Sequence, residues 1–89
     1  MQTGVKLQVR KELNGKQQLS IIKLKGSLIS RGYTEIIHIN DQDEDFHINS
    51  FETAVENRNE VHNFIKTFIN QAELTDLVIL LGNRINKGI

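Results

Sequence analysis

Four carboxylates between residues 41 and 52 have a spacing that can surround a metal ion. They occupy positions 1, 3, 5 and 12 of a twelve-residue window and belong to Asp41, Asp43, Asp45 and Glu52. Ca²⁺ prefers carboxylate oxygens at this spacing. However, Phe46 stands at position 6, where the turn around the ion needs glycine, and residues 34–40 have the pattern of a strand instead of a helix. We therefore expect a solvated acidic loop in preference to a calcium site, and we predict no metal or cofactor.

Two histidines flank this acidic loop. Residues 34–40 and 46–48 are patterned as two strands, and a register that keeps their apolar residues on one face sets His38 opposite His47. Two imidazoles beside a carboxylate can bind a divalent transition metal, whereas the plainer interpretation is a pair of surface histidines, which we prefer. His62 lies in a helical segment near its apolar stripe and is expected to be a packing residue.

Patterns typical of covalent or phosphate chemistry are missing from the sequence. The chain has no cysteine, which excludes disulfides, zinc–thiolate sites and thiol catalysis. No serine lies in a nucleophile-elbow pattern, and no glycine-rich phosphate loop precedes a helix. We therefore predict no catalytic residues and a protein that is not an enzyme.

The segment from Val5 to Ile29 is patterned as a hairpin. Asn14-Gly15 between two apolar runs is a strong signal for a two-residue turn. The resulting register aligns Leu7 with Ile22 in the core and sets lysines opposite each other on the outer face. Such a face is either solvated or binds an anionic partner. The residues that we predict for partner or nucleic-acid binding are Lys6, Arg10, Lys23, Lys25 and Arg31.

The second half of the chain changes to a helical period. A helix is predicted from about Arg58 to Ala72, and a second from about Asp76 to Asn86, whereas Phe51–Glu60 is open between helix, strand and loop. The run Leu77–Leu81 is apolar on all sides and fits central burial, a further strand or an oligomer contact. The residues of that contact would be Leu77, Leu80 and Leu81.

Together these segments predict the fold class. We expect an α+β protein in which an antiparallel β-meander of about four strands precedes a C-terminal helical hairpin packed on one face. The 89 residues are expected to form one small domain, residues 1–89.

Charge is segregated along the chain although the net charge is zero. Residues 1–34 carry seven Lys or Arg against one Glu, and residues 35–60 carry eight Asp or Glu against one Arg. Segregated charge can steer and orient a partner. We therefore predict a small non-enzymatic protein-interaction module, such as a regulator, inhibitor or assembly component. We expect it to form a homo-oligomer, most simply a dimer, and its protein partner is unknown. The alternative is a nucleic-acid-binding protein that uses the basic hairpin face.

The sequence also bears on location. Its longest apolar run is far shorter than the roughly 20 residues that span a bilayer. No signal-peptide pattern is present, and we expect a cytoplasmic protein of a bacterium or phage that does not bind membranes.

Overall fold

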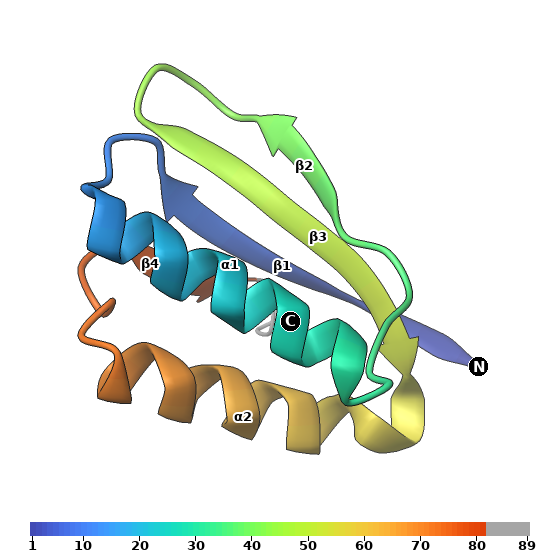
Figure 1. The fold of residues 1–89 in the computed structure, drawn as a ribbon. Helices are drawn as coiled ribbons and strands as arrows, with labels where there is room; N and C mark the ends of the chain where they lie inside the picture. Colours follow the sequence, from blue (N-terminus) through green and yellow to red (C-terminus); the bar gives the residue numbers. More distant parts are fainter. Residues whose placement is uncertain (82–89) are drawn as a thin grey trace, which may run out of the picture.

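Two α-helices lie on one face of a four-stranded antiparallel sheet (Figure 1). The computed structural model describes residues 1–81. The elements follow in the order β1 (Gln2–Arg10), α1 (Gly15–Ser30), β2 (His38–Asp41), β3 (Phe46–Ala54), the 3-10 helix η1 (Val55–Asn57), α2 (Arg58–Gln71) and β4 (Val78–Leu81). The predicted α+β class and four-stranded antiparallel sheet are therefore confirmed.

The strands are not arranged as the predicted meander. Their order in the sheet is β2-β3-β1-β4, and each neighbouring pair is antiparallel. α1 therefore connects the parallel strands β1 and β2, with β3 inserted between them, and α2 connects β3 and β4 around β1. This is the ferredoxin-like, or split β-α-β, order of elements. Because this architecture hosts many unrelated functions, it assigns none to this chain.

Residues 15–30 form a helix, so the predicted Val5–Ile29 hairpin is wrong. Asn14 is the N-cap: its side-chain oxygen accepts from the Gln17 N–H at 2.8 Å, and the Gln17 side chain accepts from the Asn14 N–H at 2.9 Å. This capping box satisfies two N–H groups at the start of the helix. Asn14 is in an extended conformation, with φ −76° and ψ 174°, so it cannot form the type I′ turn, which needs positive φ.

The C-terminus of α1 is closed by a glycine. Gly32 has φ +80°, and its N–H donates to the Ile29 carbonyl at 3.0 Å. The Tyr33 N–H donates to the Leu28 carbonyl at 3.0 Å, which completes the cap and turns Tyr33 into the core.

The predicted pairing of residues 34–40 with 46–48 is shifted in the structure. His38 pairs with Ser50, and Asp41 pairs with His47. The turn is tighter than predicted because the Asp43 side chain accepts from the N–H groups of Asp45 and Phe46, at 2.8 and 3.0 Å. As a result His38 and His47 lie on opposite faces of the sheet, and the hypothesis that they share a metal is wrong.

The C-terminal half contains one of the two predicted helices. α2 confirms the helix expected from about residue 58, and β3 extends through Ala54, which resolves the segment left open. The prediction of a second helix over residues 76–86 is wrong at residues 78–81, which form β4. Residues 82–86 lie outside the described part of the chain. β4 pairs with β1, so the further-strand alternative for this apolar run is the correct one.

The core lies between the helix-facing side of the sheet and the two helices. It combines the alternate residues of β1 with one stripe from each helix and residues from β3, β4 and the loops. Its buried apolar members are Val5, Leu7, Val9, Ile21, Leu24, Leu28, Tyr33, Phe51, Val61, Ile65, Ile69, Leu74 and Val78. Ile22, which the predicted hairpin placed in the core, is exposed instead. Ile39, which the predicted register placed on the apolar face of the strands over 34–40 and 46–48, is also exposed.

Candidate protein-binding surface

Helix α1 carries a second apolar stripe on the side that faces away from the core. Its buried residues recur at helical spacing and define the core side. On the opposite side the exposed fractions of Leu19, Ile22 and Ile29 are 68%, 60% and 45%. An ordinary surface helix is polar on this side, because only one stripe is needed for the core. This apolar surface is therefore not explained by the packing of the described chain.

Gly26 lies between these residues on the same side of α1. Leu19, Ile22, Gly26 and Ile29 are separated by three, four and three residues, which keeps them in line along the helix. We call these four residues the outer stripe. A Cβ atom added at Gly26 would have nothing within 4 Å, so the protein's own packing does not require glycine there. The missing side chain leaves a notch in the outer stripe.

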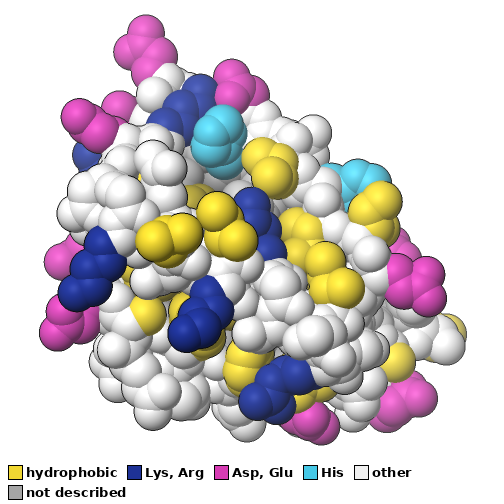
Figure 2. Space-filling model, in the orientation of Figure 1, with side chains coloured by type: hydrophobic (Ala, Val, Ile, Leu, Met, Phe, Trp, Pro, Cys, Tyr) yellow, Lys and Arg dark blue, Asp and Glu magenta, His cyan; other side chains and the backbone are white. Residues whose placement is uncertain are grey.

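Lysines flank the outer stripe on both sides. Lys16 and Lys23 lie on one side and Lys25 on the other, and α1 contains no Asp or Glu. Within residues 1–81 the close contacts between carboxylates and basic side chains are those of Asp41 with Lys11 and with the His47 imidazole, so these three lysines have no carboxylate partner there. Figure 2 shows hydrophobic side chains gathered on this face with Lys and Arg among them, while carboxylates lie toward its margins.

The apolar surface continues from α1 toward β2. Ile36 and Ile39 have exposed fractions of 60% and 54%. Ile39 shares with Ile22 the lining of a hollow of about 280 Å³, and Ile36 shares with Ile29 the lining of a larger one of about 870 Å³. Both hollows are also lined by polar and charged side chains, so the exposed isoleucines of α1, of the loop before β2 and of β2 surround mixed surfaces.

Asn49 is a polar residue at the smaller hollow. It is only 3% exposed, lies between Leu7 and Ile39 in the sheet, and its side-chain oxygen has no hydrogen-bond partner. A buried polar atom without a partner is costly, by about 1–3 kcal/mol. This acceptor is available to a donor that enters the hollow beside α1.

The predicted basic residues do not form one face. Lys23 and Lys25 flank the outer stripe, whereas Lys6 and Arg10 lie on the open face of the sheet, which carries no helix. The Arg10 guanidinium lies 5.8 Å from the Phe46 ring centroid on that open face. Arg31 lies over the Phe64 ring of α2 at 4.4 Å, so it contributes to the contact between the helices.

The predicted oligomer residues are placed by β4 and the turn before it. Leu77 and Leu80 are half-buried and pack against the core. Leu81 is half-buried on the open face, opposite Lys6. The apolar character of this run is thus largely explained by packing within the chain.

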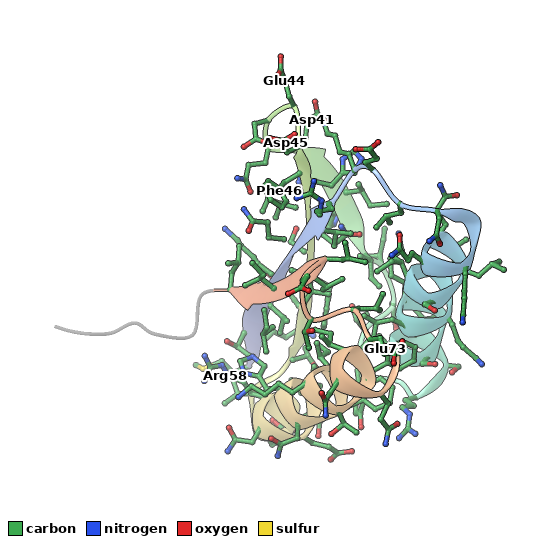
Figure 3. All side chains as sticks on the ribbon, turned by 90° about the vertical axis from the view of Figure 1, so that its left-hand side faces the viewer. Asp41, Glu44, Asp45, Phe46, Arg58 and Glu73 are labelled. Atoms are coloured by element: carbon green, nitrogen blue, oxygen red, sulfur yellow. The ribbon has the colours of Figure 1, made fainter. Side chains whose placement is uncertain are left out.

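The acidic loop does not gather its carboxylates around a point. Asp41, Glu44 and Asp45 lie around the tip of the β2–β3 loop (Figure 3), and Asp43 is hydrogen-bonded to the loop backbone. Glu52 is six residues into β3, roughly 20 Å from the loop at about 3.3 Å per residue. No cluster of three His, Asp or Glu suited to a metal ion occurs within residues 1–81. The calcium-type spacing therefore forms no site in the described chain.

Three ionisable groups have shifted pKa values for identifiable reasons. The Lys11 ammonium, 2.9 Å from Asp41, lowers the pKa of that carboxyl. The pKa of Tyr33 is raised, first because its hydroxyl donates to Glu60 at 2.6 Å and then because it is buried. Burial lowers the pKa of His62, with Arg58 and Lys66 adding to the shift. None of these groups belongs to the outer stripe.

Sequence reasoning missed the outer stripe because it assigned the segment to a strand. Its signal was present in the sequence, since residues 19–29 contain one apolar set at 21, 24 and 28 and a second at 19, 22 and 29, which has glycine at the intervening position 26.

Among the described residues no helix is long and apolar enough to cross a bilayer. No family model matches the chain, and neither the curated proteins nor the solved structures contain a significant match.

Proposed function

We propose that this protein is a protein-interaction module that binds its partner through the outer surface of α1. The observation that carries the proposal is the exposed line of Leu19, Ile22 and Ile29 on a helix whose other side already forms the core. Full burial of an exposed Leu or Ile side chain is worth about 1.5–3 kcal/mol, and these side chains, which are 45–68% exposed, would gain roughly half of that each before the costs of association. The surface fits a regulator, inhibitor or assembly component.

Residue-specific crosslinking in the native cell tests this function. A photoreactive amino acid at position 22 is expected to form adducts with a protein, whereas the same group at position 79 is not. Ile79 is a matched control, because it is 47% exposed and lies on β4, on the open face of the sheet. Equal adducts at both positions, or none at position 22, would contradict the proposal.

The open face of the sheet supports a second candidate function, the binding of single-stranded nucleic acid. Lys6 and Arg10 supply positive charge, and Phe46 supplies a ring on which a base can stack. If this function holds, a labelled oligonucleotide binds in a salt-dependent way and Lys6→Glu with Arg10→Glu abolishes binding. Unchanged binding in that double variant, or none at low salt, would exclude the open face.

A further inference from the structure

We infer that the partner segment which docks on α1 is an amphipathic α-helix whose apolar stripe is flanked by Asp and Glu. This inference rests on the proposed function and specifies the chemistry of the partner. It is argued from the spacing of the outer stripe, the notch at Gly26 and the charges on both flanks.

The spacing of the outer stripe is that of a helix–helix contact. Residues separated by three, four and three positions form a line along one side of a helix, and a facing helix meets such a line with its own residues at the same spacing. From Leu19 to Ile29 the line is about 15 Å long at about 1.5 Å per residue. This length corresponds to three helical turns, enough for several anchors of a partner helix.

The notch at Gly26 provides room for close approach. Glycine in the interior of a helix lowers stability relative to alanine, and here nothing in the protein occupies the space of a side chain. Ile22 and Ile29 stand one turn before and one turn after the notch and are exposed. A large apolar side chain of the partner fits between them.

The charges that flank the outer stripe favour a partner helix with negative charge and disfavour a second copy of this chain as the partner. Positions beside an apolar stripe set which helices pair, through ion pairs or repulsion. Here those positions carry Lys16, Lys23 and Lys25 and no acid. Two copies of α1 would bring lysine against lysine, whereas a helix with Glu or Asp at the flanks would place opposite charges together.

A displayed library of short amphipathic helices tests this chemistry. All members carry an apolar stripe, and each flank position varies among Glu, Gln and Lys. Selection on the full-length protein is expected to enrich Glu at the flanks, and the best binder is then measured by fluorescence anisotropy. A protein in which Lys16, Lys23 and Lys25 are all changed to Glu is expected to prefer Lys-flanked helices instead, with at least a tenfold change in relative affinity.

Single variants locate the contact. Ile22→Asp is expected to lower the affinity for the selected helix by about 30-fold or more, the loss typical of a central anchor. Gly26→Ala is expected to lower this affinity several-fold without lowering the melting temperature of the protein. Ile79→Asp is expected to leave the affinity unchanged. The inference would be overturned by any of three results: enrichment of helices regardless of the charge at their flanks, enrichment of no helix, or an equal loss of affinity in the Ile22→Asp and Ile79→Asp variants.

The two levels of the proposal fail separately. If crosslinks from position 22 reach a protein but map to a strand, a loop or a basic helix, the interaction function stands and the acidic helix is wrong. If they map to another copy of this chain, and light scattering reports a dimer that Ile22→Asp dissolves, a second copy is the occupant and the acidic helix is again wrong. If no protein is reached from position 22, the proposed function itself fails.

Discussion

Replacing Gly26 by alanine is expected to make the protein more stable, which is unusual for a mutation. Gly26 lies inside α1, is exposed, and has nothing within 4 Å of an added Cβ atom. The methyl group therefore adds no clash and little burial, and its effect comes from helix propensity and from the restricted unfolded chain. Those effects amount to about 0.5–1 kcal/mol. For a domain of this size, 1 kcal/mol corresponds to a melting-temperature rise of about 4–8 °C.

Urea and thermal unfolding of a glycine series measure this effect. Gly15→Ala, at the first position of α1, has equal space around it and is expected to change stability less than Gly26→Ala. Gly32→Ala is expected to destabilise by about 1 kcal/mol, because Gly32 has φ +80°. If Gly26→Ala is neutral or destabilising while Gly32→Ala behaves as expected, the space around position 26 is not free, and the reasoning about the notch is wrong.

Three further outcomes follow from the hydrogen bonds and pKa shifts. Thr53→Val is expected to stabilise by about 1 kcal/mol in urea unfolding, because the Thr53 hydroxyl is buried without a partner and valine has nearly the same shape; a loss of stability would show that the hydroxyl is bonded. Tyr33→Phe is expected to cost about 1–2 kcal/mol at neutral pH through the lost bond to Glu60. Folding raises the pKa of Tyr33 from 10.0, so the contribution of Tyr33 to the free energy of unfolding is present below pH 10 and is lost as the pH rises through the folded pKa. If the Tyr33→Phe variant loses as much stability at alkaline pH as the unmodified protein does, this explanation is wrong. Finally, NMR titration is expected to place the pKa of Asp41 below 3.8, and Lys11→Met to return it toward 3.8; an unchanged pKa in that variant would remove Lys11 as the cause.

The parts of the fold that were predictable are those with one clear period. Val5, Leu7 and Val9 alternate and form the buried side of β1, and the apolar stripe of α2 begins close to where its spacing predicts. The register of β2 with β3 was less predictable, because it depends on hydrogen bonds from the backbone to the Asp43 side chain. The run Leu77–Leu81 is apolar at every position, so it has no period that separates a strand from a buried helix.

The Asn14-Gly15 pair shows why local signals are not sufficient. The same dipeptide suits a type I′ turn and a helix N-cap followed by glycine, and only residues further along decide between them. Gln17, three residues after Asn14, completes the capping box. That reciprocal pair is visible in the sequence, but it competes with a strong hairpin signal.

Ile22, which the predicted hairpin placed in the core, is exposed and lies in the outer stripe. Leu19, Ile22 and Ile29 add apolar side chains on the outer side of a helix whose core side is already apolar, and this weakens the one-sided pattern by which a helix is identified. Local sequence and fold usually agree, and a disagreement between them often marks a functional position, since the chain tolerates there what folding alone does not favour. The exposed isoleucines and the interior glycine of α1 both disagree with folding requirements in this sense. Their occurrence on one side of one helix, between lysines without acidic partners in the described chain, supports a common cause, and binding of a partner helix accounts for all of them.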